Sequence, residues 1–129
     1  MNMINRNLTD KEKYILFEGG TEAPFSGALL DEKRSGNFVC KNCGALLFES
    51  DTKFNSGTGW PSFTEPANRK HVILKEDTSH GMVRTEVMCA NCNAHLGHVF
   101  SDGPQDKGGK RYCINSTCLM FSPEEKHGK

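Results

Sequence analysis

The first apolar cluster of the chain lies between helix start and stop signals. Thr9 and Glu12 have the spacing of a capping box, and the cluster at residues 14–17 follows them directly. Two consecutive glycines, Gly19 and Gly20, then favour the end of a helix. This pattern predicts one short helix near the N-terminus.

Short apolar runs separated by turn residues fill most of the remaining chain. Glycine, proline, asparagine and aspartate recur every few residues between runs rich in valine, isoleucine, leucine and phenylalanine. This punctuation is typical of strands joined by turns, so we predict a mainly β, mostly antiparallel fold. Residues 53–68 are predicted as a long irregular loop, a type of segment that often carries function. The candidate strands are residues 37–40, 45–49, 72–76, 82–89, 95–100, 111–115 and 119–121.

Length and charge narrow the class of protein. The chain has 129 residues, and we expect a single domain over residues 5–123 with a disordered tail over residues 124–129. Acidic and basic residues balance at 16 each, which disfavours nucleic acid or an anionic membrane as a partner. No apolar run resembles a secretory signal or a membrane span. We therefore expect a soluble protein of the cytoplasm.

Four of the six cysteines form two matching Cys-x-x-Cys pairs. Cys40 and Cys43 stand in the pattern Cys-x-Asn-Cys-x-Ala-x-Leu, which Cys89 and Cys92 repeat. Such a pair directs two sulfurs at one ion from a tight turn, and two pairs complete a tetrahedral four-thiolate site. Because that site has no open position, we predict one structural zinc ion that stabilises the fold. Two redox-active pairs or two local disulfides remain the alternatives.

Cys113 is the candidate reactive thiol among the two remaining cysteines. Strand alternation over residues 111–115 places it on one face with Arg111 and Asn115. A nearby guanidinium favours the thiolate, so Arg111 is the candidate that lowers the pKa of this thiol. The alternative is a small buried hydrophobe, which is the commonest role of a free cysteine.

Two histidines and the only tryptophan complete the candidate chemistry. His95 and His98 follow the second cysteine pair, and either is a candidate proton donor. Strict alternation separates them onto opposite faces unless the strand bends, with Gly97 as the candidate position. Trp60, flanked by glycines and a proline, either forms a wall of an apolar pocket or fills the core.

Five motifs in this chain resemble those of the B-type methionine sulfoxide reductases. They are Gly-Thr-Glu-Ala-Pro-Phe-Ser-Gly at 20–27, Ser-Gly-Thr-Gly-Trp-Pro-Ser-Phe at 56–63, Ser-His-Gly-Met at 79–82, His-Leu-Gly-His-Val-Phe at 95–100 and Arg-Tyr-Cys-Ile-Asn-Ser at 111–116. The resemblance spans most of the chain and includes both cysteine pairs. It implies two small antiparallel sheets and reduction of the R epimer of methionine sulfoxide in proteins.

The resemblance also implies a role for each matching residue. Cys113 corresponds to the nucleophile, and the four paired cysteines correspond to the zinc ligands. Attack on the sulfoxide sulfur then leaves a sulfenic acid on the cysteine. His98 is preferred over His95 as the proton donor. The other implied site residues are Arg111 and Asn115 as polar active-site groups, and Trp60, Phe63 and His95 as substrate contacts.

The chain departs from the family pattern in one important position. Many members carry a recycling cysteine where this sequence has Thr58, so the usual internal disulfide has no partner here. Cys118 is the only spare thiol and therefore the candidate resolving residue. An extended strand of five residues spans roughly 16 Å and reverses the face, so a bond to Cys113 requires a sharp turn or local unfolding. Thioredoxin or another thiol is the alternative reductant. We expect a monomer.

A second class of function also fits part of the pattern. A non-catalytic, zinc-stabilised β module that binds a partner protein or peptide explains the two cysteine pairs. It gives no role to the segment around Cys113 or to the loop around Trp60. Turnover of a methionine sulfoxide peptide by the intact chain, and none by a Cys113→Ser variant, distinguishes the enzyme from the module.

Overall fold

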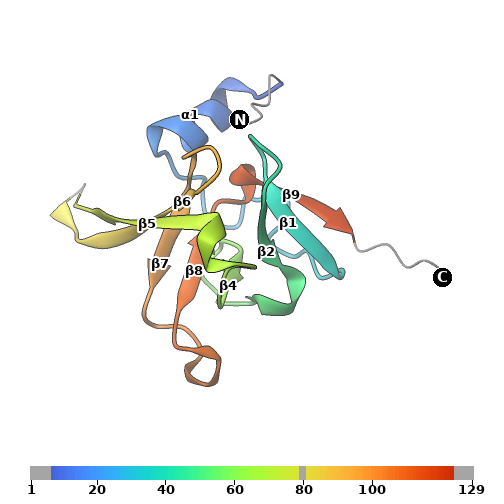
Figure 1. Cartoon of the computed structure of the whole chain (residues 1–129), viewed down its shortest axis with the longest axis vertical. Helices are drawn as coiled ribbons and strands as arrows, with labels where there is room; N and C mark the ends of the chain where they lie inside the picture. The colour runs from blue at the N-terminus through green and yellow to red at the C-terminus, as the bar shows by residue number, and fades with distance from the viewer. Residues whose placement is uncertain (1–6, 79–80, 124–129) are drawn as a thin grey trace.

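The computed structural model of the chain describes residues 7–78 and 81–123. Helix α1 (Asp10–Glu18) lies at one end of the molecule (Figure 1). It packs against β7 (His95–Phe100) and the 3-10 helix η5 (Ser116–Cys118). Thr9 Oγ1 accepts from the Glu12 amide at 3.1 Å, and Glu12 Oε1 accepts from the Thr9 amide at 2.8 Å. Gly19 ends the helix at a φ of 74°. The predicted helix and its capping box are confirmed.

The strands form two antiparallel sheets, as the fold prediction stated. The smaller sheet has the order β2 (Leu46–Glu49), β1 (Gly36–Cys40), β9 (Leu119–Pro123). The larger has the order β3 (Lys53–Phe54), β4 (Ser62–Phe63), β8 (Arg111–Ile114), β7 (His95–Phe100), β6 (Arg84–Cys89), β5 (Val72–Asp77). Short 3-10 helices connect them: η1 (Ser50–Thr52), η2 (Arg69–His71), η4 (Gln105–Lys107) and η5 (Ser116–Cys118).

The segment 53–68 contains two short strands that the sequence pattern did not predict. β3 and β4 pair with each other, and β4 pairs with β8 at Ser62 and Cys113. Two residues are too few to show an alternating pattern, which explains the error. The other strands were predicted within about two residues, while residues 5, 6 and 124–129 of the domain prediction lie outside the described part.

The hydrophobic core fills the space between the two sheets. Phe48 stacks on Phe63 with ring centroids 4.4 Å apart, and Phe38 meets Phe63 edge-on at 5.1 Å. All three rings are completely buried. Phe63, predicted as a substrate contact, has its ring in this core and outside the lining of the cavity described below.

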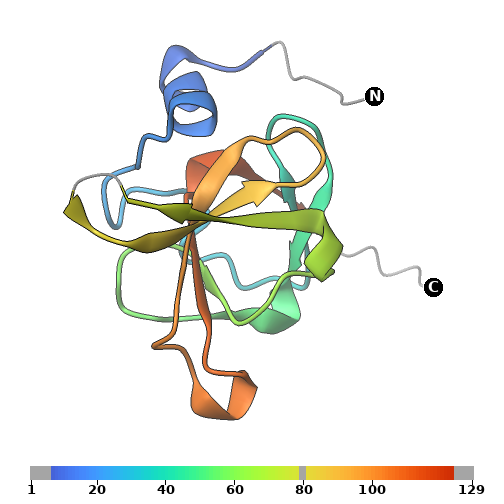
Figure 2. The ribbon, with the colours of Figure 1, turned by 60° about the vertical axis from the view of Figure 1, so that its left-hand side comes forward.

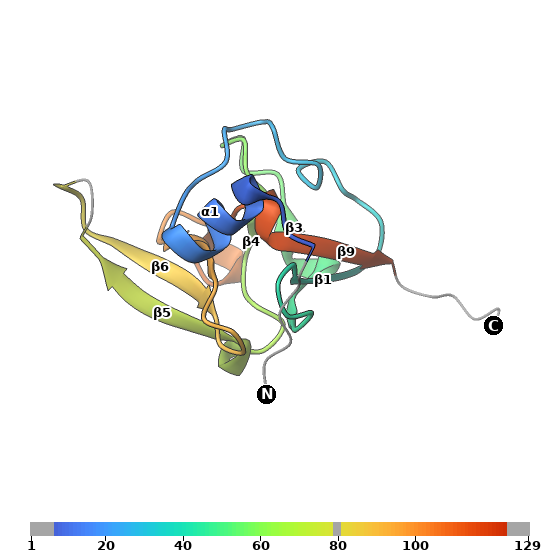
Figure 3. The same ribbon diagram turned by 90° about the horizontal axis from the view of Figure 1, so that it is seen from above.

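In the described ranges, no helix combines the length and the apolar character that crossing a membrane requires. The hairpin β5–β6 projects on one side of the molecule, and β9 leads to the other (Figures 1 and 3). The larger sheet between them brings β4, β7 and β8 side by side. This central part of the sheet carries the candidate active site.

Candidate active site and metal centre

The four paired cysteines converge on one point. Their sulfur atoms all lie within 4.8 Å of one another. Cys40 Sγ is 3.7 Å from Cys92 Sγ, and Cys43 Sγ is 3.6 Å from Cys89 Sγ. The short contacts therefore join sulfurs of different pairs, and all the cysteines are free thiols. This arrangement favours a shared ion over two separate redox pairs or two local disulfides.

The two turns that hold these sulfurs have the same backbone geometry. In the first, the Gly44 amide donates to the Cys40 carbonyl at 2.8 Å; in the second, the Asn93 amide donates to the Cys89 carbonyl at 2.7 Å. Gly44 and Asn93 have φ values of 81° and 66°, a left-handed backbone that glycine and asparagine adopt most easily. The repeated sequence pattern thus produces a repeated turn.

The cysteine cluster joins the two sheets. One turn connects β1 to β2 in the smaller sheet, and the other connects β6 to β7 in the larger (Figures 2 and 3). A tetrahedral ion with metal–sulfur bonds of roughly 2.3 Å has sulfur–sulfur edges of about 3.8 Å. The two short contacts agree with that spacing, so the four residues fit a metal of this size and geometry.

A small cavity of about 190 Å³ opens over Cys113. Its walls come from β6, β7, β8 and the loops at residues 21 and 58–60. Polar groups gather at Cys113, and an indole and a phenyl ring supply apolar surface. The lining residues are Thr21, Thr58, Trp60, Arg84, Gly97, His98, Phe100, Arg111, Cys113 and Asn115.

Cys113 faces the cavity as strand alternation predicted, while Tyr112 and Ile114 point into the core. Burial raises the pKa of the Cys113 thiol, and this outweighs the opposing effect of Arg111 and of a hydrogen bond from Thr58. Arg111 therefore lowers the pKa of this thiol as predicted, but the net shift is upward because burial outweighs its effect.

Arg111 has another partner that the sequence pattern did not indicate. Its guanidinium binds both carboxylate oxygens of Asp102, from Nε at 2.9 Å and from a terminal nitrogen at 3.2 Å. It also lies over the Phe100 ring, 4.5 Å from the centroid. Arg111 thus faces the carboxylate of Asp102 as well as the cavity that holds Cys113.

A β-bulge brings the two histidines to the same side of β7. Val87 pairs with Gly97 but Met88 pairs with His95, so Leu96 is an extra residue in the strand. The rings of His95 and His98 then meet edge to face at 5.5 Å. This bulge at Leu96 is the bend near Gly97 that was considered as the way to bring both histidines together.

Each histidine is bound to a carboxylate from a neighbouring strand. His98 Nε2 lies 2.8 Å from Asp77 on β5, and His95 Nδ1 lies 2.7 Å from Glu86 on β6. Burial lowers the pKa of His98, and the hydrogen bond to Asp77 partly opposes this shift. His98 lines the cavity, where it pairs across the strands with Cys113. His95 is buried outside the cavity lining, and its Nε2 has no hydrogen-bond partner among the described residues.

The main chain of Glu22 fixes two other candidate residues. Its carbonyl accepts from Trp60 Nε1 at 3.0 Å, and its amide donates to Asn115 Oδ1 at 3.0 Å. Asn115 also donates its side-chain amide to the Leu96 carbonyl at 3.0 Å. Asn115 is thus held firmly at both ends, and Trp60 is oriented as a wall of the cavity.

Cys118 lies in the core, away from solvent. It is completely buried, its thiol donates to the His95 carbonyl at 3.2 Å, and burial raises its pKa well above the usual range. It is the last residue of the 3-10 helix η5, beyond the end of the strand that carries Cys113. A bond between these two cysteines requires the core around η5 to open.

Comparison with known proteins identifies the family. The model of the SelR domain matches residues 8–123, almost the whole described chain. The chain belongs to the SelR domain family. Two relatives carry the name peptide methionine sulfoxide reductase MsrB: one from Bradyrhizobium diazoefficiens, 55% identical over 92% of this chain and 85% of its own, and one from Leifsonia xyli, 54% identical over 94% and 87%.

A solved structure shows that the fold of this SelR domain also occurs at low sequence identity. The crystal structure of the Mis18 'Yippee-like' domain superposes with a TM-score of 0.57, covering 72% of this chain and 100% of that one. The two sequences are 19% identical, so the likeness concerns the fold alone.

Several residues of the SelR domain site escaped sequence reasoning. Phe100 stands two positions after His98 on the same strand face, so alternation could have identified it. Glu22 lies within a motif that was recognised, but it holds Trp60 and Asn115 through its backbone and Thr117 through its side chain. Asp77 and Glu86 reach the histidines from neighbouring strands, and that pairing becomes visible only with the sheet order.

Proposed function

We propose that the chain reduces the R epimer of methionine sulfoxide in peptides and proteins to methionine. The supporting observation is the placement of Cys113 opposite His98 in a small cavity walled by Trp60, in a SelR domain with relatives named MsrB. The test is turnover of each epimer of a methionine sulfoxide peptide with dithiothreitol as reductant. Turnover of the S epimer in preference to the R epimer, or of neither, contradicts the proposal.

In the proposed reaction, oxygen passes from one sulfur atom to another. The Cys113 sulfur attacks the sulfoxide sulfur, the sulfur–oxygen bond of the substrate breaks, and the oxygen ends on Cys113 as a sulfenic acid. The substrate sulfur gains two electrons and the cysteine sulfur loses two. The thiol proton passes through His98 to the oxygen. Asp77 supports the imidazolium while it carries that proton.

The remaining cavity residues are proposed to bind and orient the substrate. The Trp60 indole contacts the methyl group on the sulfoxide sulfur, and Arg111 and Asn115 contribute to the polar side of the cavity. His95, bound to Glu86, is proposed to support His98 from behind the cavity wall instead of contacting the substrate. The hydrogen bonds that orient Trp60, His95 and Asn115 support these roles.

The pH dependence of a single turnover tests the proton path. The pKa of His98 is lower than its usual 6.5. Below that pKa the imidazole is already protonated and cannot accept the proton of the Cys113 thiol, so the rate decreases as the pH is lowered. Above the pKa of Cys113, which is higher than its usual 9.0, the proton for the oxygen is missing, so the rate falls again. We expect a plateau between these limits, measured by quenched formation of methionine without reductant.

The groups around His98 set that profile. They are Asp77, Arg84 and His95, together with Cys113 across the sheet. A His98→Gln variant is expected to lose the acid limb and at least about a hundredfold in rate, the usual contribution of a proton donor. An unchanged acid limb in this variant excludes His98 as the group that titrates.

A thiol from outside the chain is proposed to reduce the sulfenic acid. Cys118 is buried with its thiol bound to a backbone carbonyl, whereas the cavity over Cys113 is open. Thioredoxin or a small thiol is the proposed reductant. Two of its thiols then restore the Cys113 thiol and release water and a disulfide.

Restoring a cysteine beside Cys113 tests this recycling route. Thr58 lines the same cavity as Cys113 and lowers the pKa of that thiol, so Thr58→Cys places a second sulfur near the sulfenic acid. After one turnover, we expect a disulfide between the introduced cysteine and Cys113 in the variant, and no internal disulfide in the wild type. Peptide mapping by mass spectrometry provides the measurement. A Cys113–Cys118 bond in the wild type refutes the proposal.

The metal is proposed to be a single zinc ion that stabilises the fold, held by Cys40, Cys43, Cys89 and Cys92. Four thiolates leave no position for water, so the proposed reaction does not pass through it. A reducing compartment such as the cytoplasm keeps the ligands and Cys113 as free thiols. We propose that the chain acts there as a single-domain monomer over residues 5–123.

A further inference from the structure

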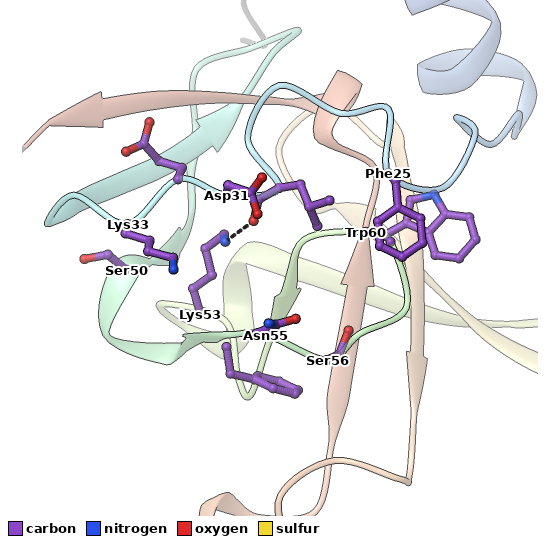
Figure 4. Close-up of a pocket in the computed structure, with 12 residues that line it drawn as sticks. Phe25, Asp31, Lys33, Ser50, Lys53, Asn55, Ser56 and Trp60 are labelled. Atoms are coloured by element: carbon purple, nitrogen blue, oxygen red, sulfur yellow. Dashed lines mark hydrogen bonds between the residues drawn. The ribbon is translucent and has the colours of Figure 1, made fainter.

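A second and larger hollow adjoins the active-site cavity. It has a volume of about 510 Å³, against about 190 Å³ for the cavity over Cys113. Trp60 lines both, so the two hollows adjoin at this residue. We call the larger hollow the flanking groove. Figure 4 shows Phe25 and Trp60 at one end of it and Lys33 and Ser50 at the other.

One wall of the flanking groove is the edge of a sheet. Both residues of β3, and the two that follow it, line the groove. Successive side chains of a strand point to opposite faces, so a hollow that both residues of β3 line runs along the edge of that strand. β3 is an outer strand of the larger sheet, and no strand pairs with its outer edge within residues 7–78 and 81–123. An unpaired edge of this kind can accept an added strand.

The opposite wall is the loop at residues 30–33. Lys53 extends from β3 toward this loop and donates to the Leu30 carbonyl at 2.7 Å (Figure 4). The groove therefore has both charge signs along it, from the carboxylates of Asp31 and Glu32 and from the ammonium groups of Lys33 and Lys53. A lining with donors and acceptors of both kinds suits a neutral peptide backbone better than an ion of one sign.

Phe25 presents an aromatic surface where the groove meets Trp60. Its side chain is 69% exposed, although its backbone amide is bound to the Gly59 carbonyl at 2.7 Å. Its φ of 63° is uncommon for a residue with a side chain. An exposed ring on a firmly held, strained backbone is typical of a contact site.

We propose that the flanking groove binds the polypeptide next to the oxidised methionine, as an extended segment along β3 with an apolar contact on Phe25. The inference rests on the proposed function, because the sulfoxide side chain occupies the cavity over Cys113. That cavity is small, so the substrate's main chain must continue outside it. The meeting of the two hollows at Trp60 provides the path.

The test compares two substrates with dithiothreitol as reductant. One is N-acetyl-methionine-R-sulfoxide methylamide, which has no flanking residues, and the other is a nonapeptide with the same sulfoxide at its centre. We expect Phe25→Ala to lower kcat/KM for the nonapeptide about fivefold and leave the value for the amide unchanged. Phe17→Ala, which removes a half-exposed ring on α1, is the matched control and should change neither.

A change in the substrate gives an independent measurement that leaves the protein intact. N-methylation of the nonapeptide's backbone on both sides of the sulfoxide removes amide donors and prevents strand pairing. We expect the kcat/KM of the wild type for the methylated nonapeptide to fall to its value for the methylamide. Equal loss on both substrates in Phe25→Ala, or full activity on the methylated peptide, overturns the proposal for the groove. If the wild type turns over neither substrate, the proposed function itself fails.

Discussion

Replacement of Cys113 by serine is expected to lower turnover of methionine R-sulfoxide by roughly 10⁴-fold or more. Serine keeps the shape of the side chain but is a far weaker nucleophile than sulfur, and it has no reversible acid like the sulfenic acid. The measurement is methionine formation from an R-sulfoxide peptide with dithiothreitol.

Cys118→Ser is the matched control for this experiment. Its hydroxyl can still donate to the His95 carbonyl, and the residue lies outside the cavity, so turnover should stay close to that of the wild type. Both variants should keep the metal and the thermal unfolding midpoint. Turnover that persists in Cys113→Ser would leave the binding module as the better description of the chain.

Loss of the metal is expected to unfold the chain at ordinary temperature. Structural zinc contributes about 10–16 kcal/mol in small zinc domains, which is comparable to the whole stability of a domain, about 5–15 kcal/mol. Here the four sulfurs join the two sheets between which the core lies. Without the ion, the four sulfurs lose the bonds that join the two turns, and thiolates at these positions would repel one another.

Two measurements check this expectation. Elemental analysis should give one zinc per chain, and a strong chelator should remove the cooperative thermal transition. Cys89→Ser should bind less metal and lose the same transition, whereas Cys113→Ser should retain both. A chelated protein that keeps its unfolding midpoint shows that the cysteine cluster does not contribute the stability assigned to it.

The sequence predicted the parts of this molecule that depend on local patterns. The capping box at Thr9, the repeated cysteine turns and the face of β8 that carries Cys113 all follow from spacing over a few residues. The five motifs also led to the right family. Such features need no knowledge of which strands become neighbours.

The features that escaped prediction depend on the arrangement of the sheets. Phe63 is in a recognised motif, but its position on β4 turns the ring into the core. Asp102 binds Arg111 from the loop after β7, a partner that the strand pattern around Cys113 does not indicate. The net pKa of that thiol depends on burial, which the sequence does not reveal.

The raised pKa of the Cys113 thiol also affects how fast this cysteine reacts with oxidants such as peroxides. Peroxides attack thiolates, and a thiol with a raised pKa offers little of that form near neutral pH. In the proposed reaction, the thiol proton leaves through His98 only when a bound sulfoxide oxygen is there to accept it. We therefore expect peroxide to oxidise Cys113 more slowly than an exposed cysteine of ordinary pKa.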